Sequence, residues 1–162
     1  MDKIAQLYDL YLSSKRVSTD TRTIEKGDLF FALKGPSFDG NQYAEKALLS
    51  GSKAVVVDDP KVVVDERYFL VADVLVALQQ LANHHRKQLD IPVIGLTGSN
   101  GKTTTKELLV RALSGKYVVQ ATYGNLNNHI GVPLTLLSLK PGTSMAIIEM
   151  GASKQGDIDV YF

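Results

Sequence analysis

Segments with helical and strand-like patterns alternate along the chain. Residues 2–12 place apolar side chains at helical spacing, with Asp2 available to cap the first turn. Residues 41–50 show a second apolar helical face that ends at Gly51. Short apolar runs with the length of buried strands occur at residues 29–33, 54–57 and 68–71. The first part of the chain is therefore predicted to be a small mixed α/β domain.

A longer amphipathic segment follows at residues 74–89, with Asp73 as its predicted cap. Its charged end leads directly to Pro92, where we expect the helix to have stopped. We place a domain boundary at this point. The two predicted domains are residues 1–90 and residues 91–162.

The second part continues the alternation of strands and helices. We expect strands at residues 91–96, 117–120 and 144–149, and helices at residues 103–114 and 133–139. Parallel sheets normally have more strands and are covered on both faces. The sequence stops at Phe162 in what resembles the start of a helix. We therefore expect this part to be the truncated start of a parallel-sheet domain.

The glycine-rich turn between the first strand and helix of this part is typical of a phosphate-binding loop (P-loop). Gly98 and Gly101 allow successive backbone N–H groups to face an anion, Lys102 adds a positive charge, and Thr103 offers a hydroxyl of the kind that binds Mg²⁺. Leu96 stands where the standard motif has a glycine, so the pattern is a variant. A chance polar turn is the alternative, but the flanking strand and helix argue against it. We predict that ATP is bound by Gly98, Ser99, Asn100, Gly101, Lys102, Thr103 and Thr104.

The apolar run at residues 144–149 ends in an acid, Glu149. Many nucleotide-binding folds place a second Mg²⁺ ligand at the tip of a strand beside the phosphate loop. A strand that ends in glutamate is common, and only the neighbouring loop favours the metal interpretation. We predict that Thr103 and Glu149 bind magnesium and that Lys102 and Glu149 are catalytic.

Composition narrows the class of protein. The chain has 162 residues, of which 44% are hydrophobic and 22% charged, with a net charge of +1 and no cysteine. A disulfide scaffold is thereby excluded, and the absence of a basic stripe argues against nucleic acid as a partner. No apolar run approaches the roughly 20 residues of a membrane span. We expect a cytoplasmic protein that is not inserted in a membrane.

The segment Gly95-Leu-Thr-Gly-Ser-Asn-Gly-Lys-Thr-Thr104 resembles the ATP-dependent Mur ligases of bacterial cell-wall synthesis. Residues 124–135 and 149–158 are similar to the MurF type within that family. The resemblance extends to the amino-terminal part, where the matching segments are residues 19–22, 27–35 and 38–40. Several motifs in the correct order make a stronger signal than any one of them.

The resemblance implies a three-domain enzyme, monomeric at full length, that joins D-alanyl-D-alanine to UDP-N-acetylmuramoyl-tripeptide. ATP phosphorylates the tripeptide carboxylate, and the amine of D-alanyl-D-alanine attacks the acyl phosphate. On this basis residues 1–90 are the UDP-substrate-binding domain and residues 91–162 are part of the central ATP-binding domain. The family's later histidine, carbamylated lysine and carboxy-terminal domain would follow Phe162, so we expect the 162-residue chain not to ligate by itself.

The resemblance also implies substrate contacts in both parts of the chain. The matching residues are Asp20, Thr21, Arg22, Lys34, Gly35, Asp39, Gly40, Asn125, Asn127 and Asn128. Judged without the family, an Asp-x-Arg sequence in a polar loop is usually a surface ion pair. The asparagine cluster is equally well explained as a polar turn.

Two other functions remain open at this point. Another Mur ligase, such as the one that adds the third amino acid, shares the loop and the UDP-domain pattern, although the segment at residues 125–133 argues against it. A P-loop switch without ligase activity is the second alternative. Such switches usually carry an aspartate where this chain has Glu149, together with a mobile glycine-containing segment.

Overall fold

The computed structural model describes residues 2–151 and 158. The chain forms two compact units, Met1–Leu81 and Ala82–Phe162. The division falls within helix α3 (Val74–Gln88), which continues from one unit into the other, so the predicted boundary between residues 90 and 91 stays a prediction. Residues 152–157 of the motif at 149–158, and the helix start expected near the end of the chain, lie outside the described residues.

The first unit contains a four-stranded, fully parallel sheet in the order β1-β2-β5-β6. Its strands are β1 (Val17–Ser18), β2 (Leu29–Phe31), β5 (Ala54–Val57) and β6 (Tyr68–Leu70). A separate antiparallel hairpin follows β2 and consists of β3 (Lys34–Gly35) and β4 (Phe38–Asp39). The sequence pattern predicted β2, β5 and β6, but it gave no indication of β1 or of the hairpin.

The helices of this unit begin where the sequence places capping residues. The Asp2 carboxylate accepts a hydrogen bond from the Ile4 amide at the start of α1 (Lys3–Leu12). Asp39 caps a 3₁₀ turn, η1 (Gly40–Tyr43), which leads into α2 (Ala44–Leu49). The predicted helix at 41–50 is therefore two elements. A second 3₁₀ turn, η2 (Pro60–Val62), starts at Asp59.

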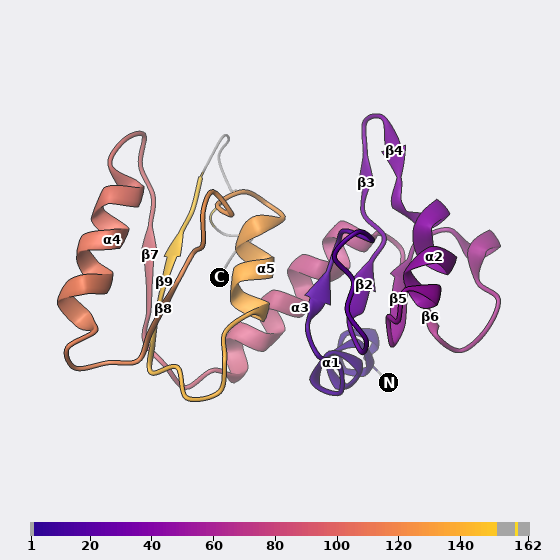
Figure 1. Ribbon diagram of the computed structural model, residues 1–162, viewed down its shortest axis with the longest axis horizontal. Coiled ribbons are helices and arrows are strands. Elements are labelled where there is room, and N and C mark those ends of the chain that lie inside the picture. Colours follow the sequence, from indigo (N-terminus) through magenta and orange to yellow (C-terminus); the bar gives the residue numbers. More distant parts are fainter. Residues whose placement is uncertain (1, 152–157, 159–162) are drawn as a thin grey trace. The chain divides into compact units, whose positions relative to one another are not determined.

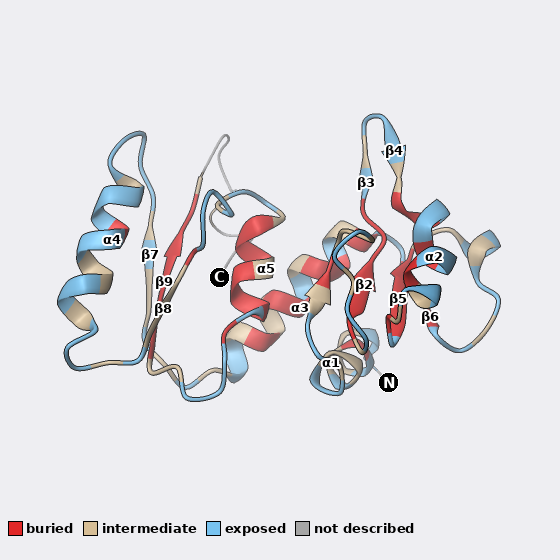
Figure 2. Cartoon of the chain, viewed as in Figure 1, coloured by how far each residue is buried: buried red, intermediate tan, exposed pale blue. Residues whose placement is uncertain are grey.

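The core of the first unit lies on both faces of the sheet. Phe30, Val55 and Val57 pack with the small residues of α2 on one face. Leu29, Phe31 and Val56 alternate with them, face the opposite side where α1 and α3 lie, and are fully buried (Figures 1 and 2). Burial on two faces explains why β5 reads as an uninterrupted apolar run in the sequence.

An ion pair between the fully buried Asp28 and the partly exposed Arg16 fixes the loop between β1 and β2. The Asp28 carboxylate is fully buried, accepts a hydrogen bond from the Glu25 amide at 2.8 Å, and lies 3.1 Å from the Arg16 Nε. The Arg16 backbone carbonyl also accepts from the Leu29 amide. Both ends of the loop that carries residues 19–22 are thereby attached to the start of β2.

The second unit has a three-stranded parallel sheet in the order β7-β9-β8. Its elements are β7 (Val93–Leu96), α4 (Lys102–Leu113), β8 (Val119–Ala121), α5 (Gly131–Leu137) and β9 (Met145–Glu149). The chain passes from β7 over to β8 and then back to β9, and right-handed crossovers in opposite directions place α4 and α5 on opposite faces of the sheet (Figure 1). The three predicted strands and two predicted helices are all present.

Burial in this unit is concentrated on β9 and α5. All five residues of β9 are buried, whereas the edge strand β7 is half-buried and α4 is mostly exposed (Figure 2). The one buried residue of α4 is Lys106, whose ammonium donates a hydrogen bond to the Thr122 carbonyl at 2.8 Å. This contact joins α4 to the chain segment directly after β8.

Replacing Leu29 with alanine should destabilise the first unit, because the side chain of this β2 residue is fully buried. We expect a loss of about 2–5 kcal/mol in the free energy of unfolding for Leu29→Ala. Urea unfolding followed by circular dichroism measures it. Leu49→Ala is the matched control, because Leu49 is 83% exposed and its replacement should cost little. Similar losses in both variants would contradict the assignment of the core.

Candidate functional site

The glycine-rich turn lies between β7 and α4, as the sequence predicts. Gly98 and Gly101 have φ angles of +130° and +78°, a region that other residues adopt at a cost, and Gly101 is the cap residue of α4. The Thr105 amide makes the first helical hydrogen bond, to the Gly101 carbonyl. Residues 97–101 are exposed. The loop therefore presents its backbone N–H groups and the amino end of α4 to solvent, an arrangement suited to a phosphate.

Lys102 occupies the first turn of α4, and its ammonium donates a hydrogen bond back to the Gly98 carbonyl across the loop. The charge is thereby held above the opening of the loop. Ser99, Asn100 and Thr104 are exposed on the same loop and helix start.

Glu149 lies beside the loop because β9 pairs with β7. The register places Leu96 opposite Glu149, so the acid and the loop leave the sheet at the same edge. The Glu149 carboxylate is buried, and it accepts hydrogen bonds from the Thr103 hydroxyl at 3.0 Å and from the Asn127 amide group at 2.9 Å. Two residues that the sequence predicts as magnesium ligands are thus in direct contact.

The donor set at this point suits a hard divalent cation. Within residues 2–151 and 158, no lysine, arginine or histidine forms an ion pair with the Glu149 carboxylate. The Glu149 carboxylate is contacted by neutral donors, and Mg²⁺ is commonly bound by one carboxylate together with hydroxyl, water and phosphate oxygens. No group of three acidic, histidine or cysteine side chains in the described part of the chain forms a complete metal site.

Thr122 and Lys106 form a chain of hydrogen bonds that leads to the Glu149 backbone. The Glu149 amide donates to the Thr122 hydroxyl at 2.8 Å, and the Thr122 carbonyl accepts from the Lys106 ammonium. Both side chains are almost completely buried. No sequence pattern singled them out, although the position of Lys106 one turn after Thr103 places these two residues on the same face of α4.

The three predicted asparagines have different surroundings. Asn127 contacts Glu149, and its carbonyl accepts from the Gly151 amide. The Asn128 side chain accepts from the Ile130 and Gly131 amides and so caps the start of α5. Asn125 is exposed. Substrate contact by these residues stays a prediction, and Asn127 is the one that the structure brings to the acid.

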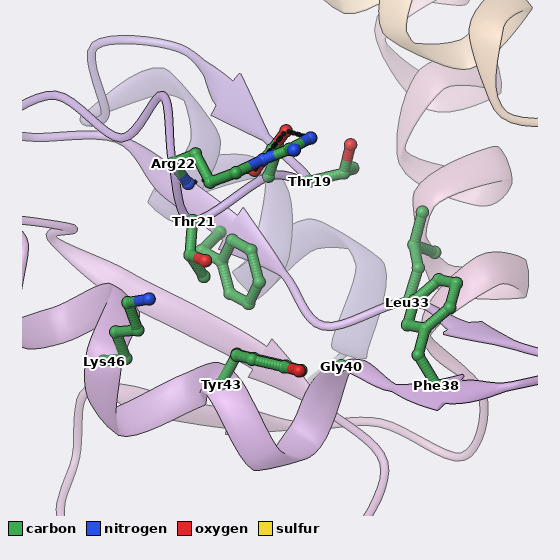
Figure 3. Close-up of a pocket in the computed structure, with 10 residues that line it drawn as sticks. Thr19, Thr21, Arg22, Leu33, Phe38, Gly40, Tyr43 and Lys46 are labelled. Carbon is green, nitrogen blue, oxygen red and sulfur yellow. Dashed lines mark hydrogen bonds and ion pairs between the residues drawn. The ribbon is translucent and has the colours of Figure 1, made fainter.

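The first unit contains a separate pocket of about 540 Å³, within the range of small-molecule sites. Its lining combines a polar loop, apolar side chains and a helix, as Figure 3 shows. The lining residues are Thr19, Asp20, Thr21, Arg22, Phe30, Leu33, Phe38, Gly40, Tyr43 and Lys46. Leu33 and Phe38 lie at one end, and Thr21 and Lys46 lie toward the other (Figure 3). The pocket therefore has an apolar end and a basic end.

Asp20 and Arg22 form a bidentate ion pair at the rim of the pocket. The Arg22 Nε and Nη2 lie 2.9 and 2.6 Å from the Asp20 carboxylate oxygens, and the Arg22 amide donates to the same carboxylate. Hydrogen bonds from the Arg22 side chain and then from its amide lower the pKa of Asp20 to about 2. The arginine is 83% exposed, so its remaining donors are accessible to a ligand.

The predicted substrate residues of the first unit fall into two groups. Asp20, Thr21, Arg22 and Gly40 line the pocket, whereas Lys34, Gly35 and Asp39 do not. Gly35 and Gly40 are needed for packing, because neither position has room for a side chain. A Cβ at Gly40 would overlap the backbone of Ala32 and Leu33, and a Cβ at Gly35 would overlap the Phe38 ring.

Tyr43 and Lys46 line the pocket, although no sequence pattern singled them out. They stand three residues apart where η1 passes into α2, and this spacing places both on one helical face. Phe30, Leu33 and Phe38 were expected only as strand or loop residues. They lie within the matching segments 27–35 and 38–40, but no residue pattern there singles them out, because their role depends on where the β3–β4 hairpin lies.

None of the helices in the described part of the chain combines the length and apolar character that a membrane crossing requires.

Two family models match the sequence. Residues 96–162 match the Mur ligase middle domain, and residues 14–93 match the model described as the Mur ligase family, catalytic domain. A protein of Bacillus subtilis called UDP-N-acetylmuramoyl-tripeptide–D-alanyl-D-alanine ligase is 47% identical over 146 residues, covering 89% of this chain and 32% of the relative. The chain therefore spans about a third of the length of the curated relatives it matches.

Solved structures give the same result. MurF from Acinetobacter baumannii superposes with a TM-score of 0.85 at 38% identity, covering 98% of this chain and 37% of that protein. MurF ligase from Thermotoga maritima, in complex with ADP, superposes with a TM-score of 0.83 at 37% identity, covering 93% of this chain and 35% of that protein. The fold of both units thus has experimentally solved counterparts.

The lowered pKa of Asp20 predicts its response to acid and to mutation. Because ionised Asp20 is favoured by Arg22, the contribution of this pair to stability is complete above the ordinary pKa of 3.8 and disappears as the pH falls from 3.8 to about 2. In Arg22→Ala the pKa of Asp20 should rise toward 3.8, as measured by carboxyl-carbon NMR titration. Arg67→Ala, which breaks the pair between Asp65 and Arg67, is the control. An Asp20 that still titrates near 2 in Arg22→Ala would contradict the assignment.

Proposed function

This chain belongs to the Mur ligase family, and we propose that it forms part of an ATP-dependent ligase that joins D-alanyl-D-alanine to UDP-N-acetylmuramoyl-tripeptide. The observation that carries the proposal is the convergence of the Lys102 loop, Thr103, Asn127 and Glu149 at one sheet edge. The relatives' names support the choice of substrates within the family, because matches from Bacillus subtilis, Synechocystis and Escherichia coli share the same name.

The loop of the second unit is proposed as the ATP site. Its exposed N–H groups and the amino end of α4 suit the phosphate chain, and Lys102 supplies a full positive charge where the γ-phosphoryl oxygens gather. A relative with the same fold was solved in complex with ADP, which agrees with this choice of nucleotide. Thr103 and Glu149 would hold Mg²⁺, which neutralises charge on the transferring phosphoryl group when bound.

The chemistry explains why an amide-forming enzyme needs these groups. A carboxylate is a poor electrophile, and phosphorylation converts it into an acyl phosphate that an amine can attack. The protein contributes position and electrostatic stabilisation to that phosphoryl transfer. Here Lys102 faces the loop, and the Asn127 amide together with the Thr103 hydroxyl fixes the orientation of the Glu149 carboxylate.

The pocket of the first unit is proposed to hold the UDP end of the sugar–peptide substrate. Asp20 and Thr21 offer polar groups for a base or ribose, Phe38 and Leu33 offer an apolar wall, and Lys46 offers a cation for phosphate. Arg22 stays charged at all physiological pH values, as does its ionised partner. We further propose a cytoplasmic location, since ATP and nucleotide-linked precursors are cytoplasmic compounds. We also propose that the full-length enzyme is a monomer.

Because the proposed ATP site and the proposed UDP site lie in different units, a substitution in one should affect one ligand and spare the other in the full-length enzyme. Lys102→Ala should remove most ATP-dependent activity, with about 2–4 kcal/mol lost in transition-state stabilisation, while leaving UDP-substrate affinity near that of the wild type. Arg22→Ala should weaken the UDP-substrate and spare ATP. Calorimetric titration of both ligands, together with phosphate release, measures the two effects.

Lys140→Ala is the control for the loss of a lysine, because Lys140 is exposed and outside both sites. Normal turnover in Lys102→Ala would show that the loop assignment is wrong. Equal loss of both ligands in Arg22→Ala would show that the pocket is not a separate substrate site. Tighter binding of a UDP-muramoyl-dipeptide than of the tripeptide would favour the ligase that adds the third amino acid.

A further inference from the structure

A polar network centred on a buried asparagine lies beside the pocket of the first unit, and neither of the ligand sites proposed above uses it. Its centre is Asn41, which is 2% exposed in the turn η1. The Asn41 side-chain amide donates to Asp39 and to Asp58, each at 2.8 Å. Its oxygen accepts from the Asp58 amide at 3.1 Å. A buried asparagine with all of these partners is expensive to disturb, because any loss leaves a buried group without its hydrogen bond.

Asp58 joins the network to three other elements. It follows β5 directly, and one carboxylate oxygen accepts from the Lys34 ammonium at 2.7 Å as well as from Asn41. The other oxygen accepts from the Val74 amide at the start of α3. Burial by itself would raise the pKa of Asp58, but the hydrogen bonds from Lys34, Asn41 and Val74 outweigh it and lower the pKa. The carboxylate is therefore ionised at neutral pH.

Both strands of the β3–β4 hairpin are attached to this network. Lys34 on β3 is paired with Asp58, and Asp39 on β4 accepts from the Asn41 backbone and side chain. The hairpin is short, with two residues in each strand, and such a hairpin has little stability of its own. These attachments therefore help to fix its position.

The hairpin supplies one end of the pocket. Leu33 precedes β3, Phe38 belongs to β4, and Gly40 follows β4, and all three line the cavity. The Gly40 amide also donates to the Leu33 carbonyl at 2.9 Å, which closes the base of the hairpin. Movement of the hairpin would therefore move the apolar end of the pocket relative to Thr21 and Lys46 (Figure 3).

We propose that Asn41 and Asp58 are positioning residues that hold the β3–β4 hairpin, through Lys34 and Asp39, in the place where it forms the apolar end of the nucleotide pocket. This inference rests on the proposed UDP site and adds a role for residues outside it. It also changes the role of Lys34. The sequence predicts a substrate contact for this lysine, whereas its ammonium here serves as the link between the hairpin and Asp58.

Two variants of the full-length enzyme test the link, with UDP as the probe. Asp58→Asn keeps the shape of the side chain and removes its charge, and Lys34→Met removes only the ammonium. In each we expect the dissociation constant for UDP to rise on the order of tenfold and the hairpin amides at residues 34–40 to exchange hydrogen faster. The double variant should be no worse than Asp58→Asn alone, because that variant already breaks the link to Lys34 and also alters the hydrogen bonds with Asn41 and Val74.

Asp65→Asn is the matched control, since it breaks another ion pair of the first unit, with Arg67, outside the pocket. It should leave UDP affinity and hairpin exchange unchanged. Urea unfolding of each variant separates a general loss of stability from a displaced hairpin. A lower unfolding free energy in Asp58→Asn with unchanged UDP affinity would overturn the inference.

A direct phosphate contact by Lys34 gives a different pattern. Asp58→Asn would then release the lysine and leave UDP affinity unchanged or improved, whereas Lys34→Met alone would weaken it, and this result would also overturn the inference. If the wild type bound no UDP while both variants still loosened the hairpin, the positioning role would stand and the proposed ligand would be wrong.

Discussion

The parallel pairing of β7 with β9 is the interaction on which the candidate ATP site depends. It brings residues more than forty positions apart, Thr103 and Glu149, into hydrogen-bond contact. The carboxyl ends of parallel strands meet at one edge of a sheet, and the chain uses that edge for chemistry. The first unit follows the same rule, because residues 19–22 follow β1 and Leu33 follows β2. Both candidate sites thus lie at the carboxyl ends of parallel strands.

Much of this arrangement could be predicted from the sequence. The long apolar and amphipathic segments identified the larger helices and strands, and the glycine-rich turn identified the phosphate loop, since each depends on local pattern. The short β1 and the β3–β4 hairpin could not be predicted, because each strand has only two residues, too few to show a strand pattern. β1 also forms only through pairing with β2, twelve residues further along the chain. For the same reason the roles of Thr122, Lys106 and Asn41 appeared only in the folded protein.

Buried or nearly buried polar groups recur beside both sites. Asn41 and Asp58 stand behind the pocket of the first unit, and Lys106 and Thr122 stand behind Glu149 in the second. Such groups cost free energy to bury and contribute little net stability over apolar residues of the same shape. Their benefit is a single defined geometry, because an apolar contact tolerates sliding and a hydrogen-bond network does not. Positional accuracy is what a phosphoryl-transfer site and a ligand pocket require.

The tight approach of Gly40 to the backbone of Ala32 and Leu33 restricts how this pocket can diverge in evolution. No side chain fits at position 40, so that part of the wall is fixed for every descendant that keeps the fold. Phe38, Tyr43 and Lys46 carry side chains toward the cavity from exposed or half-exposed positions and can change without disturbing the core. A change in the ligand that this pocket prefers is therefore easier to make at those three positions than at Gly40.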